Sequence, residues 1–124
     1  MQTLFEGVGE QKLLEVITAF YDKAFKDPMI CHFFFGKNQA HLTKRQISFS
    51  SVMLGSKNHS YTGKPLKKAH SGLPLKNPHF DRRQVLMRET LSEHGVCMEI
   101  AKKWLELEEN LRPLIVNTVV GCKK

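Results

Sequence analysis

The sequence lacks any long hydrophobic run and any paired set of cysteines. No apolar segment approaches the roughly 20 residues that a membrane-spanning helix needs. Residues Met1 to Glu6 show no basic segment followed by an apolar one, so we expect no signal peptide. The three cysteines, Cys31, Cys97 and Cys122, suit neither a disulfide framework nor a zinc knuckle. These absences predict a soluble protein of the reducing cytoplasm, without a membrane partner.

The chain also lacks the motifs of several enzyme classes. It has no glycine-rich phosphate loop, and its carboxylates fall on polar faces with no opposed pair for acid–base work. None of its six histidines are paired at positions i and i+4, so a zinc site on one helix is unsupported. No stretch alternates apolar and polar residues for long enough to form a strand, which predicts an all-α fold without repeats.

Negative charge is scarce relative to positive charge. There are 19 lysines and arginines against 12 aspartates and glutamates, a formal net charge of +7. The basic residues are scattered, and aromatic residues do not interleave with them as a platform for stacked bases requires. A solvated basic surface is the simplest explanation, and we expect no nucleic-acid partner. A basic helical nucleic-acid-binding module remains the remote alternative.

What the chain does contain is a series of amphipathic segments within one domain of 124 residues. Proline and glycine punctuate the series, because proline ends a helix or begins a new one. The expected helices are 10–26, a short one from Pro28 to about Phe33, 39–54, a short one ending at His70, 78–94, and 97–120 with a kink at Pro113.

Two polar residues on apolar stripes require an explanation. Tyr21 lies on the inner face of the first long helix, and Gln46 lies in a stripe of the next. Gln46 either reaches water at the edge of its stripe or hydrogen-bonds an interior group. A lone histidine is more often structural than a ligand, but imidazole is a standard axial ligand of haem iron. A gas bound to haem iron opposite His70 would give both polar groups a shared partner.

Further motifs then occur in one order along nearly the whole chain, and together the chain resembles the group I truncated haemoglobins. The matching pieces are Phe20-Tyr21, Asp27-Pro28 with Phe33-Phe34, Leu42 with Gln46, the stretch from Tyr61 to His70, His79-Phe80-Asp81, and Gly95-Val96. Residues 1–3 and 121–124 lie outside the match and are expected to be loose tails of the single domain 1–124. Gly9-Glu10 and Gly55-Ser56 depart from the family's Gly-Gly pairs.

The resemblance implies a two-over-two helical sandwich around one haem b. His70 would be the iron ligand, while His79 would begin the next helix. Tyr21 and Gln46 would be the donors that act on bound O₂, and Leu42 cannot ligate iron. The expected haem-contacting residues are Phe34, Leu42, Lys44, Arg45, Phe49, Leu66, His70, Leu73 and Phe80. Lys44 and Arg45 are equally well explained as propionate partners or as solvated surface residues.

The implied function is binding of O₂, NO and CO at the iron. The expected reaction is oxidation of NO to nitrate, which would make the chain a nitric oxide dioxygenase. Turnover would need an external reductase, because the sequence has no flavin or nicotinamide motif. A carrier or sensor without turnover is the alternative. We expect a cytoplasmic monomer.

Overall fold

The computed structural model describes residues 2–57 and 75–116, which are helical with no strand among them. The elements are α1 (Leu4–Val8), α2 (Glu10–Ala24), the 3₁₀ helix η1 (Cys31–Phe34), α3 (Gln39–Met53), α5 (Asn77–Glu93), α6 (Met98–Glu109) and α7 (Arg112–Ile115). The all-α prediction is therefore confirmed. A search of the described helices finds none with the length and apolar character needed to cross a bilayer.

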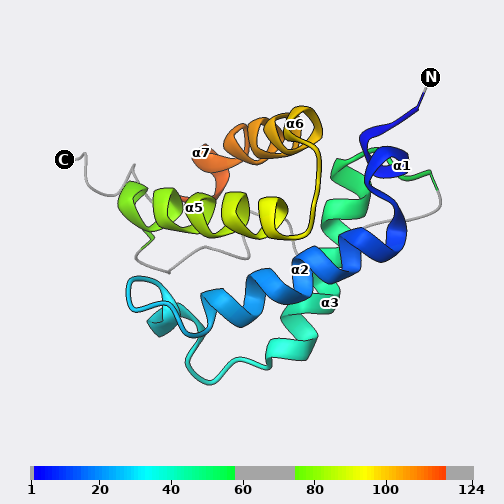
Figure 1. The fold of residues 1–124 in the computed structure, drawn as a ribbon. Coiled ribbons are helices and arrows are strands. Elements are labelled where there is room, and N and C mark those ends of the chain that lie inside the picture. The colour runs from blue at the N-terminus through cyan, green and yellow to red at the C-terminus, as the bar shows by residue number, and fades with distance from the viewer. Residues whose placement is uncertain (1, 58–74, 117–124) are drawn as a thin grey trace.

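Four long helices form two packed pairs. α2 crosses α3, while α5 and α6 lie side by side and run in opposite directions (Figure 1). α2 also packs on α5 and so joins the two pairs, and α1 bridges α2 and α6. This arrangement is the expected two-over-two sandwich.

The core lies where α2 meets α5 and α6. Leu13 and Ile17 of α2, Met87 and Leu91 of α5, and Trp104 of α6 have no exposed surface. Leu13 and Ile17 are four residues apart, as are Met87 and Leu91, so each pair lies on one side of its helix. The apolar periodicity thus predicts these buried positions correctly, whereas Leu14, which the same pattern places on the buried face of α2, is 43% exposed.

The turn after α2 is fixed by Asp27, a buried carboxylate. Its Oδ2 accepts the backbone N–H of Met29 at 3.1 Å, and its Oδ1 accepts the Nε–H of Arg82 at 2.9 Å. The short helix expected to start at Pro28 begins later, at Cys31. The intervening residues form turns that close on the carbonyl of Asp27, which accepts the N–H groups of Ile30 and Cys31.

The prediction of one kinked helix from 97 to 120 is wrong for the described residues, because α6 ends at Glu109 and α7 begins at Arg112. Pro113 lacks an N–H and suits a helix start better than a helix interior. The Arg112 guanidinium reaches back to α5, where it bonds Asn77 Oδ1 at 3.0 Å and Asp81 Oδ1 at 2.7 Å.

α1 was not predicted, although its start carries a recognisable signal. Thr3 Oγ1 accepts the N–H of Glu6, and Glu6 Oε1 accepts the N–H of Thr3. This reciprocal pair is a capping box, and the spacing Thr-x-x-Glu is its sequence pattern. Five residues are too few to show the periodicity on which the other helices were predicted.

Candidate functional site

An aromatic cluster forms where α2 ends. The Tyr21 ring meets the rings of Phe20, Phe25 and Phe34 edge-on, with centroid distances of 5.2, 6.1 and 6.1 Å. Phe25 stacks on Phe34 at 4.7 Å. Residues that are distant in the sequence, Tyr21 and Phe34, are thus brought together as expected. Both are half-buried and pack against the edge of the core.

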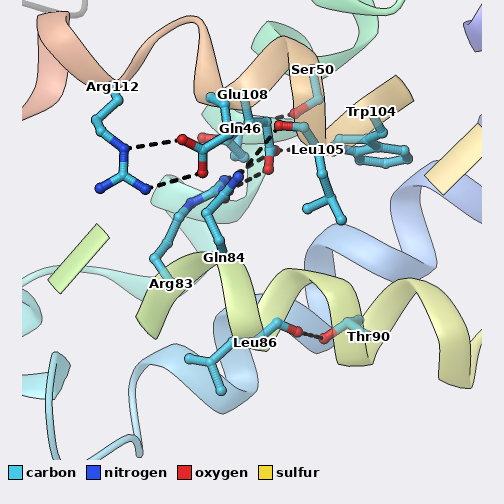
Figure 2. Close-up of polar contacts among 11 residues, drawn as sticks. Gln46, Ser50, Arg83, Gln84, Leu86, Thr90, Trp104, Leu105, Glu108 and Arg112 are labelled. Atoms are coloured by element: carbon cyan, nitrogen blue, oxygen red, sulfur yellow. Dashed lines mark hydrogen bonds and ion pairs between the residues drawn. The ribbon is translucent and has the colours of Figure 1, made fainter. Parts of the chain in front are cut away.

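α3 presents apolar side chains that the described residues do not fully cover. Its fully buried residues are two serines, Ser50 and Ser51, whereas Leu42 and Phe49 are half-buried. Gln46 donates through Nε2 to Ser50 Oγ at 2.9 Å (Figure 2). Gln46 is half-buried and bonds a buried hydroxyl of its own helix, so it has the hydrogen bond of one alternative and keeps the partial exposure of the other.

The start of α5 supplies Phe80 and His79. Phe80 is buried, and the guanidinium carbon of Arg112 lies 4.5 Å from its ring centroid. His79 Nδ1 accepts the backbone N–H of Lys76 at 3.0 Å, and its ring meets Phe33 edge-on at 4.9 Å. His79 therefore belongs to the first turn of this helix, as the sequence indicates.

A buried polar cluster joins α5 to α6 and was missed by the sequence analysis. Arg83 forms a two-bond ion pair with Glu108, whose Oε2 also accepts the Trp104 indole N–H at 3.0 Å (Figure 2). Burial lowers the pKa of the Arg83 guanidinium, but the charge and hydrogen bonds of Glu108 more than offset this and raise it. The guanidinium therefore stays charged. Its signal in the sequence is weak, because charged residues 25 positions apart resemble solvated ones.

The remaining predicted site residues are either exposed or lie outside the described part of the chain. Lys44 and Arg45 are exposed on α3, a position that suits both of their proposed roles. Leu66, His70 and Leu73 lie outside the described residues. Within 2–57 and 75–116, no three His, Cys, Asp or Glu side chains gather in a way that would hold a metal ion.

These residues fit a flat, largely apolar group. The half-buried Tyr21, Phe34, Leu42 and Phe49 offer the aromatic and aliphatic contacts that a macrocycle needs. Removing the remaining apolar surface from water would stabilise the complex by about 25 cal/mol per Å². Haem fits this description.

Comparisons with known proteins decide the family. Residues 3–117 match the bacterial-like globin family. The chain is 35% identical over 112 residues to a group 1 truncated haemoglobin of Tetrahymena pyriformis, covering 90% of this chain and 92% of the relative. The chain belongs to the group I truncated haemoglobins. A group 1 truncated haemoglobin of Nostoc sp. is 29% identical over 119 residues, 94% of this chain and 99% of that one.

Solved structures agree with this assignment. The crystal structure of truncated haemoglobin from Tetrahymena pyriformis in its Fe(III) form has a TM-score of 0.88 and 34% identity, covering 93% of this chain and 98% of that chain. The 2/2 haemoglobin of Synechococcus sp. has a TM-score of 0.87 at 22% identity, with 94% and 99% coverage, and supports the fold alone. Globins bind haem and, at its iron, diatomic gases, so this truncated haemoglobin is a haem-based ligand-binding protein.

Proposed function

We propose that this truncated haemoglobin holds haem b through His70, binds O₂ and converts NO to nitrate with electrons from an external reductase. The observation that supports the proposal most directly is the cluster in which Tyr21 lies against Phe34, with α3, the helix that carries Gln46, packed beside α2. This arrangement provides an apolar wall with two polar groups set into it. A pocket that binds a small polar ligand needs both.

Each side chain has a distinct part in the proposal. Haem iron, when bound, supplies reversible gas binding and the oxidation of NO by O₂. Tyr21 donates its phenolic O–H to the ligand, and Gln46 supports it through its amide. A neutral hydrogen bond of this kind is worth about 0.5–1.5 kcal/mol, which slows ligand release. Phe34 and Leu42 exclude water, and Leu42 leaves the ligand side free of a competing protein donor.

The test of ligation compares two histidine variants. His70→Ala should lose haem or the five-coordinate ferrous spectrum, read from the visible absorption of the purified protein. His79→Ala is the matched control, because His79 lies near the site but its Nδ1 accepts a hydrogen bond from the backbone N–H of Lys76. It should keep the wild-type spectrum. Loss of the spectrum in the His79 variant and its retention in the His70 variant would reverse the assignment.

The test of turnover is the reaction with NO. Ferrous protein equilibrated with O₂ and mixed with NO in a stopped-flow instrument should give nitrate and ferric protein faster than free haem does. A rate equal to that of free haem would remove the dioxygenase proposal. Slow autoxidation without reductase coupling would favour the alternative of a carrier or sensor for O₂ or NO.

The reductase is proposed as an acidic protein, because the chain carries a formal net charge of +7 and opposite charges speed docking. A monomer in the cytoplasm is the setting that we propose for this reaction. Cys31 and Cys97 are free thiols in the described part of the chain, which suits a reducing compartment.

A further inference from the structure

Arg83 is a largely buried arginine of α5, the helix that also carries Phe80. Its side chain is 20% exposed, and its partner Glu108 is 5% exposed. The adjacent Arg82 differs, since it is 34% exposed and pairs with Asp27 at the turn after α2. Arginine is almost never buried without a partner, so Glu108 explains how Arg83 can be inside. It does not explain why a charge is needed there.

The Arg83 guanidinium lies near two aromatic rings, of which Phe80 is one of the expected haem-contacting residues and Phe20 is a core residue that contacts Tyr21. Its central carbon lies 4.8 Å from the ring centroid of Phe20 and 6.0 Å from that of Phe80. Phe20 in turn meets the Tyr21 ring at 5.2 Å. The positive charge is thus one side chain away from the tyrosine that we propose as the ligand's hydrogen-bond donor.

The hydrogen bonds leave part of the guanidinium unengaged by the described residues. Nη1 donates to Glu108 Oε1 and to Gln84 Oε1, and Nη2 donates to Glu108 Oε2 at 3.1 Å. These bonds use three of about five N–H groups that an arginine carries. In the part of the chain that the structure describes, no residue takes the Nε–H or the second N–H of Nη2.

Stability alone is a weak reason for this ion pair. Replacing a buried ion pair with well-packed apolar residues is often neutral or stabilising, because both charges must be removed from water. An electrostatic role in the pocket is a more specific account. In a site of low dielectric, a fixed cation acts on a charged ligand much more strongly than it would in water.

We propose that Arg83, held in place by Glu108 and Gln84, is the cation of the ligand pocket and makes the site selective for small monovalent anions and for ligands that gain negative charge on binding. This inference rests on the proposed haem site and adds a ligand class to it. Glu108 sets the strength of the effect, since its carboxylate partly neutralises the guanidinium. The two residues of the pair therefore have opposite effects on an anion.

The test uses azide as the probe and the haem-loaded ferric protein, titrated by the change in Soret absorbance. Arg83→Met should weaken azide binding by about tenfold, because one positive charge that attracts the anion is lost. Glu108→Gln should strengthen azide binding by several-fold, since it keeps a hydrogen-bonding side chain of similar size but removes the negative charge. Arg83→Lys should restore most of the wild-type affinity.

Arg82→Met is the matched control, because it removes a neighbouring arginine of α5 whose partner lies at the turn after α2. It should leave azide affinity within about twofold of wild type, since screening by water weakens more exposed charges. The C–O stretching frequency of the ferrous CO form gives a second readout. It should rise in Arg83→Met and fall in Glu108→Gln, because positive potential at the ligand draws electrons into its antibonding orbital.

The outcomes separate this inference from the proposed function. Equal azide affinity in wild type, Arg83→Met and Glu108→Gln, with a normal haem spectrum, would overturn the role of Arg83 and leave the haem site standing. Weakening in both variants would also overturn it, because it indicates a purely structural ion pair. Failure of wild-type protein to bind haem would instead overturn the proposed function. If Arg83→Met does not fold, Glu108→Gln decides the matter, because a CO stretching frequency that does not fall in this variant would overturn the role of Arg83.

Discussion

Removal of the Arg83–Glu108 pair should show strong non-additivity in the free energy of unfolding. Glu108→Leu leaves a guanidinium that is 20% exposed without its carboxylate, and it also strands the Trp104 indole N–H. Arg83→Met leaves a carboxylate that is 5% exposed with the indole as its remaining donor among the bonds described above. Loss of one partner from a buried ion pair destabilises a protein by about 3–5 kcal/mol, which we expect for each variant.

The double variant Arg83→Met/Glu108→Leu should lose far less than the sum. It contains no unpaired charge, and its main defect is the unsatisfied N–H of Trp104, which costs about 1–3 kcal/mol. The coupling between the two sites is therefore expected to be at least about 3 kcal/mol, well above the ~0.5 kcal/mol within which independent sites add.

The assay is urea unfolding followed by far-UV circular dichroism at fixed protein and haem concentrations. Haem must be held constant because a ligand that binds the folded state adds to its apparent stability. Losses in the double variant that equal the sum of the two single losses would refute the reasoning. They would mean that the two side chains are solvated independently and that the buried cluster does not act as a unit.

Three further predictions concern other parts of the fold. Tyr21→Phe should speed O₂ release from the ferrous protein by about twofold to tenfold in stopped-flow displacement, whereas an unchanged rate would contradict donation by the phenol. The hydrogen bond from Arg82 holds the pKa of the Asp27 carboxyl below its ordinary value despite burial. The ionised Asp27 therefore contributes its full stabilisation above about pH 4, and this contribution declines as the pH falls through the lowered pKa. Asp27→Asn should therefore flatten the acid limb of urea midpoints against pH, and an unaltered limb would assign it to other groups. Gly95 follows α5 with a φ of 73°, so Gly95→Ala should lower the free energy of unfolding by about 1 kcal/mol, and no loss would show that the turn adapts.

The sequence predicts α2 and α5 well because the buried residues of each helix recur at helical spacing within a short segment. Leu13 and Ile17 repeat at the helical period, and the same holds for Met87 and Leu91, so the buried face can be deduced without knowing what covers it. The family resemblance adds the order of motifs. The meeting of Tyr21 with Phe34 is expected from that order and is found in the structure.

The break between α6 and α7 illustrates what local patterns cannot supply. Apolar residues continue at helical spacing through Pro113, and a kink is all that proline by itself predicts. The end of α6 at Glu109 accompanies contacts of Arg112 with Asn77 and Asp81, residues more than thirty positions earlier. Such tertiary contacts override periodicity at helix ends, where boundaries are least determined by sequence.

The polar part of the site was only half predictable, for a related reason. Gln46 could be recognised as a candidate because it interrupts an apolar stripe of its own helix. Arg83 and Glu108 did not, since each is unremarkable in its own segment and becomes informative when the other lies opposite it. Charged residues are read as solvated by default, and that default fails where two helices bring opposite charges together in the interior.

The contacts of Arg112 also have a consequence for how the protein is made. This side chain fastens the first turn of α5 through Asn77 and Asp81 and covers the Phe80 ring. Synthesis proceeds from the N-terminus, so Arg112 leaves the ribosome well after the first turn of α5, with which it forms hydrogen bonds. The first turn of α5, which follows His70 in the sequence, therefore gains these contacts late in synthesis. We expect stable haem binding only after Arg112 has emerged. Nascent chains arrested before and after this residue would reveal the step as a gain in haem retention.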